Sequence, residues 1–511
     1  MKKYKYIFLL IGLSIVGCSD LEEEPIGLLA PEGFFQSTGD IQTAVNGAYG
    51  HMLHRNFMSR EMSMSLMLRS DMVNLNKNVT NAERVQFNDI KLLADNANIA
   101  VYCPKCYQII GAANQAIAGS ELVSADVAVK NKIIAQAYFA RAFVYYHLVR
   151  QFGDIPYLDK PVTDIQAAST MSKTPAAQVY LNIIEDLKFA KEWLPNTQTT
   201  RAIPAKSAAS GYLAEVYLTI GEFQKSYDEA KDIISKESTY NLGLEADFQN
   251  LFDATKSAAS KEPLFLLDFN GQSDGDQARN YQAAFTGIRN DAQYGYGGGW
   301  SVEVPALAVY TTWDSRDYRK AFSLDATAVF KGVTVDYTQF TNTSIGGYAA
   351  GDNSPHIAKF TRKAGPAAEG NGRTTKSDYI MMRYAEVLLI AAEALNEITP
   401  GTTEADGYIN RVRARARNTA GVATTFPANV TTGLSKDAFR TLVLEERRLE
   451  LAFEFKRWYD IARRKLGTTV FSASGLEGAK ANFDPARDYL FPLPSNELVR
   501  NPNLLPQNPG Y

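Results

Sequence analysis

The sequence contains little cysteine and little histidine, with three and four of these residues among 511. A structural zinc site needs about four Cys or His ligands. The chain offers one close pair, Cys103 and Cys106, and its histidines supply no second paired motif. No Asp-rich loop has the spacing of an EF-hand, so calcium stays unassigned. We expect no metal site from these residues and no cofactor.

The paired cysteines lie in the motif Cys103-Pro104-Lys105-Cys106. A redox pair with this spacing is typical of a βαβ context, whereas the residues from Tyr107 to Ile117 have the pattern of a helix start. We therefore expect either a local disulfide or two inert thiols.

The chain also lacks a surplus of one charge, because its 53 Lys and Arg are interspersed with 56 Asp and Glu, for a net charge of -3. It has no basic stripe of the kind that binds a phosphate backbone, so we expect no nucleic-acid partner. Beyond the first residues, no apolar run approaches the roughly 20 residues of a membrane-spanning helix. At 45% hydrophobic residues, the chain can nevertheless bury a large core.

The first residues have the order of a bacterial lipoprotein signal. Lysines at positions 2, 3 and 5 precede a short apolar run, Ile7 to Val16, and then Gly17 and Cys18. We predict a signal peptide at 1–17, acylation of Cys18, and a tethering linker at 18–40, since acyl chains bind a membrane through their buried methylenes. The alternative is an ordinary secretory signal with an incidental cysteine.

Helical periodicity dominates the rest of the chain, which predicts a mainly α fold. The predicted helices are Ile41 to Leu53, Tyr107 to Ala118, Val129 to Val149, Ala176 to Leu194, Ala205 to Ile220, Phe223 to Ser235, Tyr379 to Glu397, Glu404 to Arg417 and Lys436 to Leu466. Within Ser210 to Ile234, small and aromatic residues follow the tetratricopeptide spacing. We predict one domain at 41–511, with helical repeats at about 41–236 and 379–466.

Between the two helical regions lies a loop-rich insert at about 263–375. It is rich in Gly, Asn, Ser and Thr, with short β-leaning runs at Pro263 to Phe269 and Gly332 to Phe340. Aromatic residues make up 11% of the chain, including 27 Tyr, which suits flat surfaces for sugars or peptides. In the insert, Tyr294, Tyr296 and Trp300 stand among glycines, where ring faces can stay uncovered. Trp300 either anchors this loop or forms a ligand platform, and Trp313 is a core residue.

Five successive blocks resemble the SusD/RagB family of Bacteroidota nutrient-uptake lipoproteins. They are Ala135 to Ala142 running on to Pro156, Ala205 to Leu218, Arg383 to Arg413, Glu446 to Asp460, and the end of the chain from Leu493 to the terminal Asn508-Pro509-Gly510-Tyr511. One departure is Phe455, where family members usually carry glycine. The acidic run after Cys18 resembles the surface-export signal of such lipoproteins.

The resemblance implies a lipid-anchored, non-catalytic outer-membrane protein exposed on the cell surface. Its expected role is to capture an oligosaccharide, less often a peptide, and to pass it to a SusC-like TonB-dependent transporter. It also implies that the ligand lies mainly at loops outside the repeats, and that Tyr102 faces it. Asp71, Asn74 and Asn76 are further candidates, because their side chains can bond sugar hydroxyls.

Two other functions remain as alternatives. A surface glycoside hydrolase needs two carboxylates about 5 to 10 Å apart, for which Asp291 and Glu303 beside Trp300 are the candidates. A pure repeat scaffold would bind protein and no small ligand. Glu446, Glu450 and Glu454 recur every four residues, but interleaved arginines favour ion pairs, for which Arg447 and Arg457 have three-residue spacing.

Overall fold

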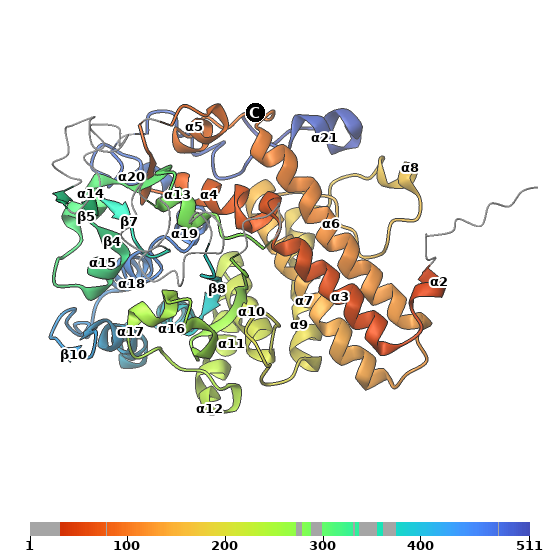
Figure 1. Ribbon diagram of the computed structural model, residues 1–511, viewed down its shortest axis with the longest axis horizontal. Helices are drawn as coiled ribbons and strands as arrows, with labels where there is room; N and C mark the ends of the chain where they lie inside the picture. Colours follow the sequence, from red (N-terminus) through yellow and green to blue (C-terminus); the bar gives the residue numbers. More distant parts are fainter. Residues whose placement is uncertain are drawn as a thin grey trace, which may run out of the picture.

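The computed structural model describes residues 31–511 except 78, 272–277, 288–298, 331–332, 337–354, 361–374 and 479. Helices make up most of these residues, and the strands are short. The mainly α fold with tetratricopeptide-like helix pairs is therefore confirmed. The first described helix, α2 (Pro31–Phe34), lies at one end of the molecule, far from the loop-rich region (Figure 1).

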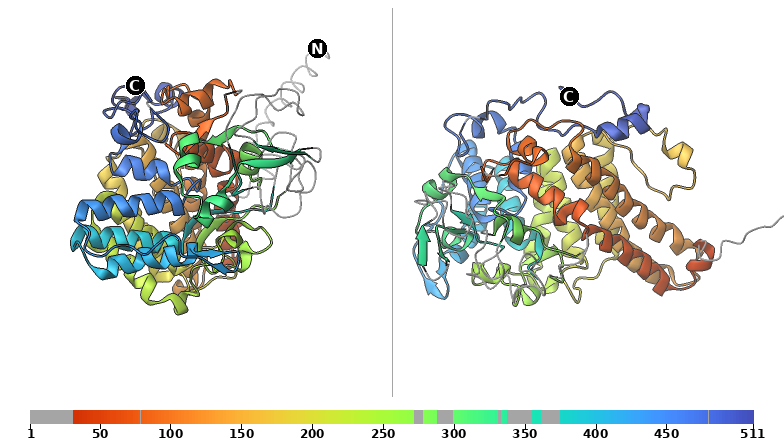
Figure 2. Two further views of the ribbon diagram at one scale, coloured as in Figure 1. Left: turned by 90° about the vertical axis from the view of Figure 1, so that its left-hand side faces the viewer. Right: turned by 45° about the horizontal axis from the view of Figure 1, so that its top comes forward.

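Four long helices pack side by side to form the amino-terminal half (Figures 1 and 2). They are α3 (Thr38–Met52), α6 (Ala97–Gly119), α7 (Val127–Phe152) and α9 (Ala176–Trp193). The start of α7 is fixed by Asp126, whose carboxylate accepts hydrogen bonds from the backbone N–H groups of Ala128 and Val129. The helix ends at Gly153, which has φ 72°, a left-handed value that glycine adopts without strain.

A second group of helices continues the packing into the carboxy-terminal half. It consists of α10 (Lys206–Ile220), α11 (Phe223–Ser235), α16 (Tyr384–Ile398), α17 (Thr403–Ala416) and α18 (Lys436–Glu450). Helix α11 packs against both α10 and α16, so it joins segments about 150 residues apart in the sequence. Gly211 permits a close approach, because a Cβ there would lie 2.5 Å from the sulfur of Met382.

Two predicted helices are wrong in part. Residues Tyr379–Arg383 form strand β8, and the helix predicted at Lys436 to Leu466 ends at Glu450 and resumes as α19 (Arg457–Arg463). Phe453 and Phe455 in the break both have φ 65°, which explains why glycine suits position 455 in the family. Both segments are buried on every side, and such apolar runs do not distinguish strand, turn and helix by periodicity.

The strands pair two by two in antiparallel ladders. The pairs are β1 (Val73–Leu75) with β3 (Glu303–Pro305), β2 (Pro263–Leu267) with β8, β4 (Leu324–Asp325) with β7 (His356–Ile357), β5 (Thr327–Phe330) with β6 (Val333–Asp336), and β9 (Asn418–Thr419) with β10 (Val422–Ala423). The predicted β-leaning runs therefore contain β2 and β6. Both β1 and β2 pair with strands far along the sequence, which ties the insert to the helical halves.

Short helices fill the connections. They are η1 (Arg55–Ser59), α4 (Glu61–Leu68), α5 (Ala82–Asn88), η2 (Ser120–Leu122), α8 (Ile165–Ala168), α12 (Glu237–Tyr240), η3 (Phe248–Phe252), η4 (Ser257–Ala259), α13 (Gln282–Thr286), α14 (Leu307–Thr312), α15 (Tyr318–Ser323), α20 (Gly467–Val470), α21 (Ser495–Arg500) and η5 (Pro502–Leu504). Sequence periodicity missed α4 because all of its residues are buried, so it has no polar face.

The main core runs through both helical halves, with members from Val45 to Leu493. Trp313 is 3% exposed and belongs to this core, as predicted. Cys103 and Cys106 are free buried thiols on α6, so the alternative of two inert thiols holds and no disulfide joins them. No helix among residues 31–511, within the described ranges, is long and apolar enough to cross a membrane.

Candidate ligand-binding site

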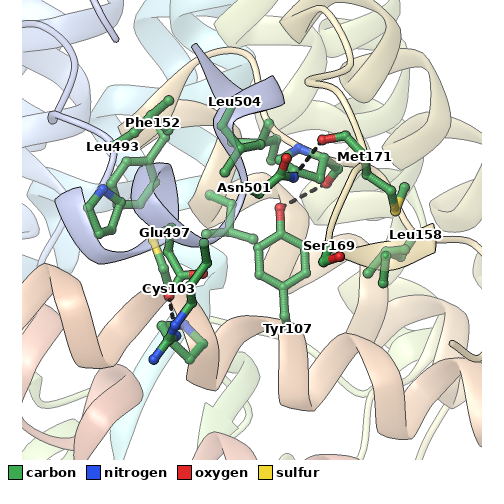
Figure 3. Close-up of a pocket in the computed structure, with 17 residues that line it drawn as sticks. Cys103, Tyr107, Phe152, Leu158, Ser169, Met171, Leu493, Glu497, Asn501 and Leu504 are labelled. Atoms are coloured by element: carbon green, nitrogen blue, oxygen red, sulfur yellow. Dashed lines mark hydrogen bonds and ion pairs between the residues drawn. The ribbon is translucent and has the colours of Figure 1, made fainter. Parts of the chain in front are cut away.

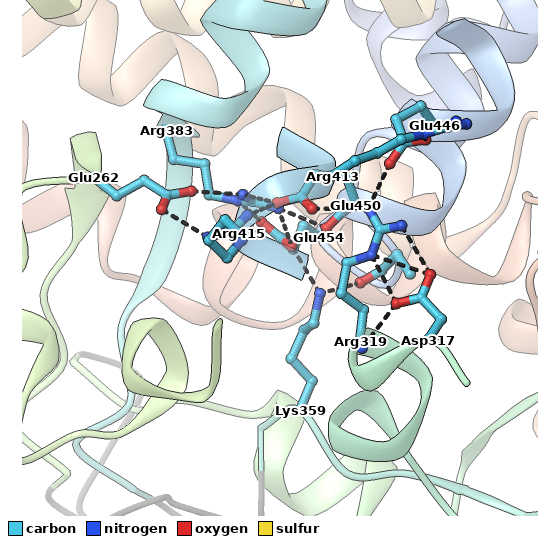
Figure 4. A network of polar contacts seen from close by, with 11 residues as sticks. Glu262, Asp317, Arg319, Lys359, Arg383, Arg413, Arg415, Glu446, Glu450 and Glu454 are labelled. Carbon is cyan, nitrogen blue, oxygen red and sulfur yellow. Dashed lines mark hydrogen bonds and ion pairs between the residues drawn. The ribbon is translucent and has the colours of Figure 1, made fainter. Parts of the chain in front are cut away.

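The carboxylates of α18 belong to a buried ion-pair network and not to a reactive cluster (Figure 4). Glu450 bonds Arg319 at 3.0 Å and Arg383 at 2.5 Å, and it also bonds Arg415. Glu454 bonds Arg383 and Lys359, each at 2.8 Å. Ion pairing of these glutamates was predicted correctly, but the predicted partners were wrong, because Arg447 binds Asp460 and Glu386 while Arg457 binds Asp71.

Charge balance explains why this network is inert. Its five cations, Arg319, Lys359, Arg383, Arg413 and Arg415, face five carboxylates: Glu262, Asp317, Glu446, Glu450 and Glu454. Burial alone would raise the pKa of Glu450, but Arg415, Arg383 and Arg319 outweigh burial and hold the pKa far below its usual value. A carboxylate with such a low pKa cannot exchange protons near neutral pH.

Two of the predicted ligand residues serve the interior instead. Tyr102 is fully buried and its ring stacks on Phe57 at 5.8 Å, so the expectation that it faces a ligand is wrong. Asp71 is 1% exposed, and both of its oxygens accept hydrogen bonds of 2.7 Å from Arg457. Tyr102 lies on α6, and Asp71 follows the end of α4. Both side chains are buried.

Asn74 and Asn76 lie beside Trp300 and hold its segment in place. Asn74 stands on β1 opposite Val304 of β3, and its side chain bonds Glu477. The backbone N–H of Asn76 donates to the carbonyl of Val302 at 2.9 Å, and its side-chain amide donates to Ser301 Oγ at 3.1 Å. These contacts indicate a positioning role for both residues.

Trp300 is half-buried and rests on two other rings. Its centroid lies 5.5 Å from that of Phe285 and 6.0 Å from that of Tyr281, both on or next to α13. The backbone N–H of Trp300 donates to the backbone carbonyl of Ala284 at 2.6 Å. Gly299 must be glycine here, because a Cβ would lie 2.0 Å from the carbonyl oxygen of Gly287. The exposed part of the indole is therefore held on a rigid base.

Arginine side chains surround these rings. The guanidinium carbon of Arg279 lies 4.6 Å from the Tyr281 centroid and 5.5 Å from that of Trp300. Arg60, before α4, lies 5.4 Å from Tyr281, and Arg84 of α5 lies 5.3 Å from Phe285. Distances of this order are typical of cation–π contacts. We call Trp300, Tyr281, Phe285, Arg60, Arg84 and Arg279 the arginine–aromatic cluster.

Glu303 is the one predicted carboxylate that the structure describes near Trp300. It is fully buried on β3, and burial raises its pKa well above the usual value, with Arg84 acting in the opposite direction. A group without exposure cannot protonate a surface-bound glycosidic oxygen. Its expected partner Asp291 lies outside the described residues, as do Tyr294, Tyr296 and Cys18.

Comparison with known proteins accounts for the whole chain. Residues 31–218 match a family model described as starch-binding and associating with the outer membrane, and residues 261–511 match the model of the SusD family. A SusD-like protein, P2, from Formosa agariphila is 52% identical over 513 residues, covering all of both chains. The chain belongs to the SusD family. The predicted resemblance to the SusD/RagB family is thus confirmed.

Solved SusD structures share this fold. A SusD homologue from Bacteroides thetaiotaomicron superposes with a TM-score of 0.82 at 19% identity, covering 94% of this chain and 98% of that one. A structure described as a laminarin binding SusD-like protein gives a TM-score of 0.76 at 20% identity, covering 93% of this chain and 100% of that one. At these identities the likeness concerns the fold.

A cavity of this SusD-family chain lies between α6, the end of α7 and α21 (Figure 3). It measures about 350 Å³ and is lined mainly by apolar side chains such as Leu148, Phe152 and Leu493. Its polar groups already have partners, since Tyr107 donates to the carbonyl of Pro156 and Asn501 to that of Met171. This cavity therefore offers few hydrogen bonds to sugar hydroxyls.

Sequence reasoning missed the five members of the arginine–aromatic cluster other than Trp300. The signal for Arg279, Tyr281 and Phe285 was present, because they precede the glycine-rich loop in the same insert. Arg60 and Arg84 gave no signal, since more than 200 residues separate them from Trp300.

Proposed function

We propose that this SusD-family chain is a non-catalytic, lipid-anchored surface protein that binds a glycan and delivers it to a SusC-like TonB-dependent outer-membrane transporter. The observation that carries the proposal is the half-buried Trp300, fixed on Tyr281 and Phe285. An indole face held in this way can stack against the C–H face of a sugar ring, and aromatic rings contribute large contact areas at low entropic cost.

Family membership supports the same proposal. The family description that matches residues 31–218 names starch binding and association with the outer membrane. A structural relative is described as laminarin binding, and the fold places most of both chains in common. The predicted acylation of Cys18 supplies a membrane anchor, and the helix pairs supply surfaces on which a transporter can dock.

Glycan binding is tested by titrating the mature protein with neutral and anionic polysaccharides in affinity electrophoresis and calorimetry. We expect Trp300→Ala to weaken binding by about tenfold or more, since loss of a stacking ring removes of order 1.5 kcal/mol. Trp193→Ala is the matched control, because Trp193 is also half-buried but lies at the end of α9. Equal affinities of wild type and Trp300→Ala would contradict the proposal.

The transporter is tested by purifying the native protein from detergent-solubilised outer membranes. Recovery with a large β-barrel supports the partnership, whereas recovery of the free protein alone contradicts it. A barrel without any glycan binding would favour the protein-binding scaffold. Turnover of a glycan that stops when Asp291 becomes alanine would favour the hydrolase, but the buried Glu303 argues against this alternative.

A further inference from the structure

The arginine–aromatic cluster differs from the interior ion-pair network in its charge balance. In the network of Figure 4, each arginine has carboxylate partners within 3.1 Å, and five cations meet five anions. In the cluster, the ion pair found among the described residues joins Arg60 to Glu61 at 3.4 Å. Arg84 and Arg279 instead lie over aromatic rings.

Among the described residues, three carboxyl groups lie close to the cluster, two of them buried and one partly exposed. They are Glu61, Glu83 and Glu303, which act electrostatically on Arg84 together with the positive charge of Arg60. Glu61 is 7% exposed and Glu303 is fully buried. Burial raises the pKa of both carboxyl groups, which favours their neutral forms. Among these described groups, three partly exposed arginines therefore face one partly exposed carboxyl group, that of Glu83.

Unused hydrogen-bond donors point to the same conclusion. The Nε atoms of Arg60 and Arg279 are buried and have no hydrogen-bond partner among the described residues. A buried polar atom without a partner is costly, whereas a guanidinium fork matches the two oxygens of a sulfate or carboxylate. The guanidinium group that carries the Arg279 donor lies over Trp300, 5.5 Å from its centroid, and that of Arg60 lies over the neighbouring Tyr281.

We propose that the arginine–aromatic cluster binds an oxyanion carried by the glycan, so that the ligand of this protein is an anionic polysaccharide. The sugar ring stacks on Trp300 while Arg279 and Arg60 bond the sulfate ester or carboxylate that it carries. Arg84 adds charge from the side of Phe285. This inference rests on the proposed glycan-binding function and adds the chemical class of the ligand.

The experiment compares polysaccharides that differ in charge. The probes are dextran and laminarin as neutral chains, dextran sulfate and κ-carrageenan for sulfate, and alginate and polygalacturonate for carboxylate. We expect binding to anionic probes, weakened between about 0.05 M and about 0.5 M NaCl because salt screens exposed charges. Binding of the sulfated or of the carboxylated probes identifies the oxyanion.

Variants locate the interaction. Arg279→Ala should weaken binding of the anionic probe by about tenfold or more, since it removes a charge-assisted hydrogen bond, and Arg279→Lys should restore part of it. Arg500→Ala is the control, because it removes the same side chain from α21, where it pairs with Glu497 at 3.0 Å beside the apolar cavity. Thermal unfolding curves verify that each variant is folded.

The outcomes separate this inference from the proposed function. Equal binding of neutral and anionic probes that is lost in Trp300→Ala but unchanged in Arg279→Ala overturns the anionic ligand and leaves glycan binding intact. Weaker binding of the anionic probe by Arg500→Ala, together with unchanged binding by Arg279→Ala, also overturns the assignment of the oxyanion to the cluster. Failure of the folded protein to bind any of the six probes contradicts the proposed function itself.

Discussion

Single buried residues give this protein a dependence on pH. Asp378, just before β8, accepts a hydrogen bond from the backbone N–H of Phe269 at 3.2 Å. Burial and then the neighbouring Asp268 raise its pKa to about 7. The folded protein therefore retains a proton on Asp378 between about pH 4 and 7, where the unfolded chain has lost it. In this interval the contribution of Asp378 to stability falls as pH rises.

Asp378→Asn removes this dependence. The amide stays neutral and can still accept from Phe269, so we expect the variant to gain stability over the wild type from pH 5 to pH 8, by up to a few kcal/mol. The measurement is the free energy of unfolding by urea at several pH values. Asp228→Asn on the exposed side of α11 is the control. A difference between Asp378→Asn and wild type that does not change with pH would refute the assignment.

At the scale of elements, the ion-pair network fixes how helices and strands meet. Arg383 ends β8, Arg415 lies in α17, Arg319 lies in α15, and all three bind Glu450 at the end of α18. The three arginines and Glu450 are 35 to 131 residues apart. These elements thus share one carboxylate, and its charge cannot be removed without leaving buried cations unbalanced.

Glu450→Gln should destabilise the fold by about 3–5 kcal/mol, because breaking a buried pair from one side leaves an uncompensated charge. The matched control is Glu185→Gln on α9, since Glu185 pairs with Lys188 on the surface at 2.9 Å and is 72% exposed. Exposed pairs of this kind contribute about 0–1 kcal/mol. Urea unfolding of both variants measures the difference, and comparable small losses would show that Glu450 does not hold the network.

At the scale of the whole molecule, the amino end and the loop-rich region lie far apart. Helix α2 begins the described chain at one end of the helical half, while α13, α14 and β3 lie toward the other end (Figures 1 and 2). Tyr281 and Phe285 of the arginine–aromatic cluster, which lie at α13, are therefore distant from the first described helix.

Cys18→Ala tests the anchor. We expect the wild type to fractionate with the outer membrane and to incorporate labelled fatty acid, and the variant to do neither, because the acylated thiol is the predicted attachment point. Ser19→Ala is the neighbouring control. A wild-type protein that is unacylated and free in the periplasmic fraction would contradict the lipoprotein signal.

Local patterns were enough for the helix pairs, the core position of Trp313 and the family. Helix faces, caps and turns depend on residues within about four positions of one another, and so they appear in the sequence. The same patterns failed for Tyr379–Arg383 and for the break after Glu450, because both are buried on all sides. Of the arginine–aromatic cluster, sequence reasoning named Trp300, and the role of Trp300 in binding stays a prediction.

The sequence by itself therefore determined a helical SusD-family chain, and it predicts a lipoprotein start and a ligand site in the aromatic insert. Only the tertiary structure decided that Tyr102 is core, that Asp71 binds Arg457, and that three arginines lie over the rings of Trp300, Tyr281 and Phe285. The physical reason is that burial and the partner of a charge depend on contacts between segments hundreds of residues apart, and no local spacing encodes such contacts.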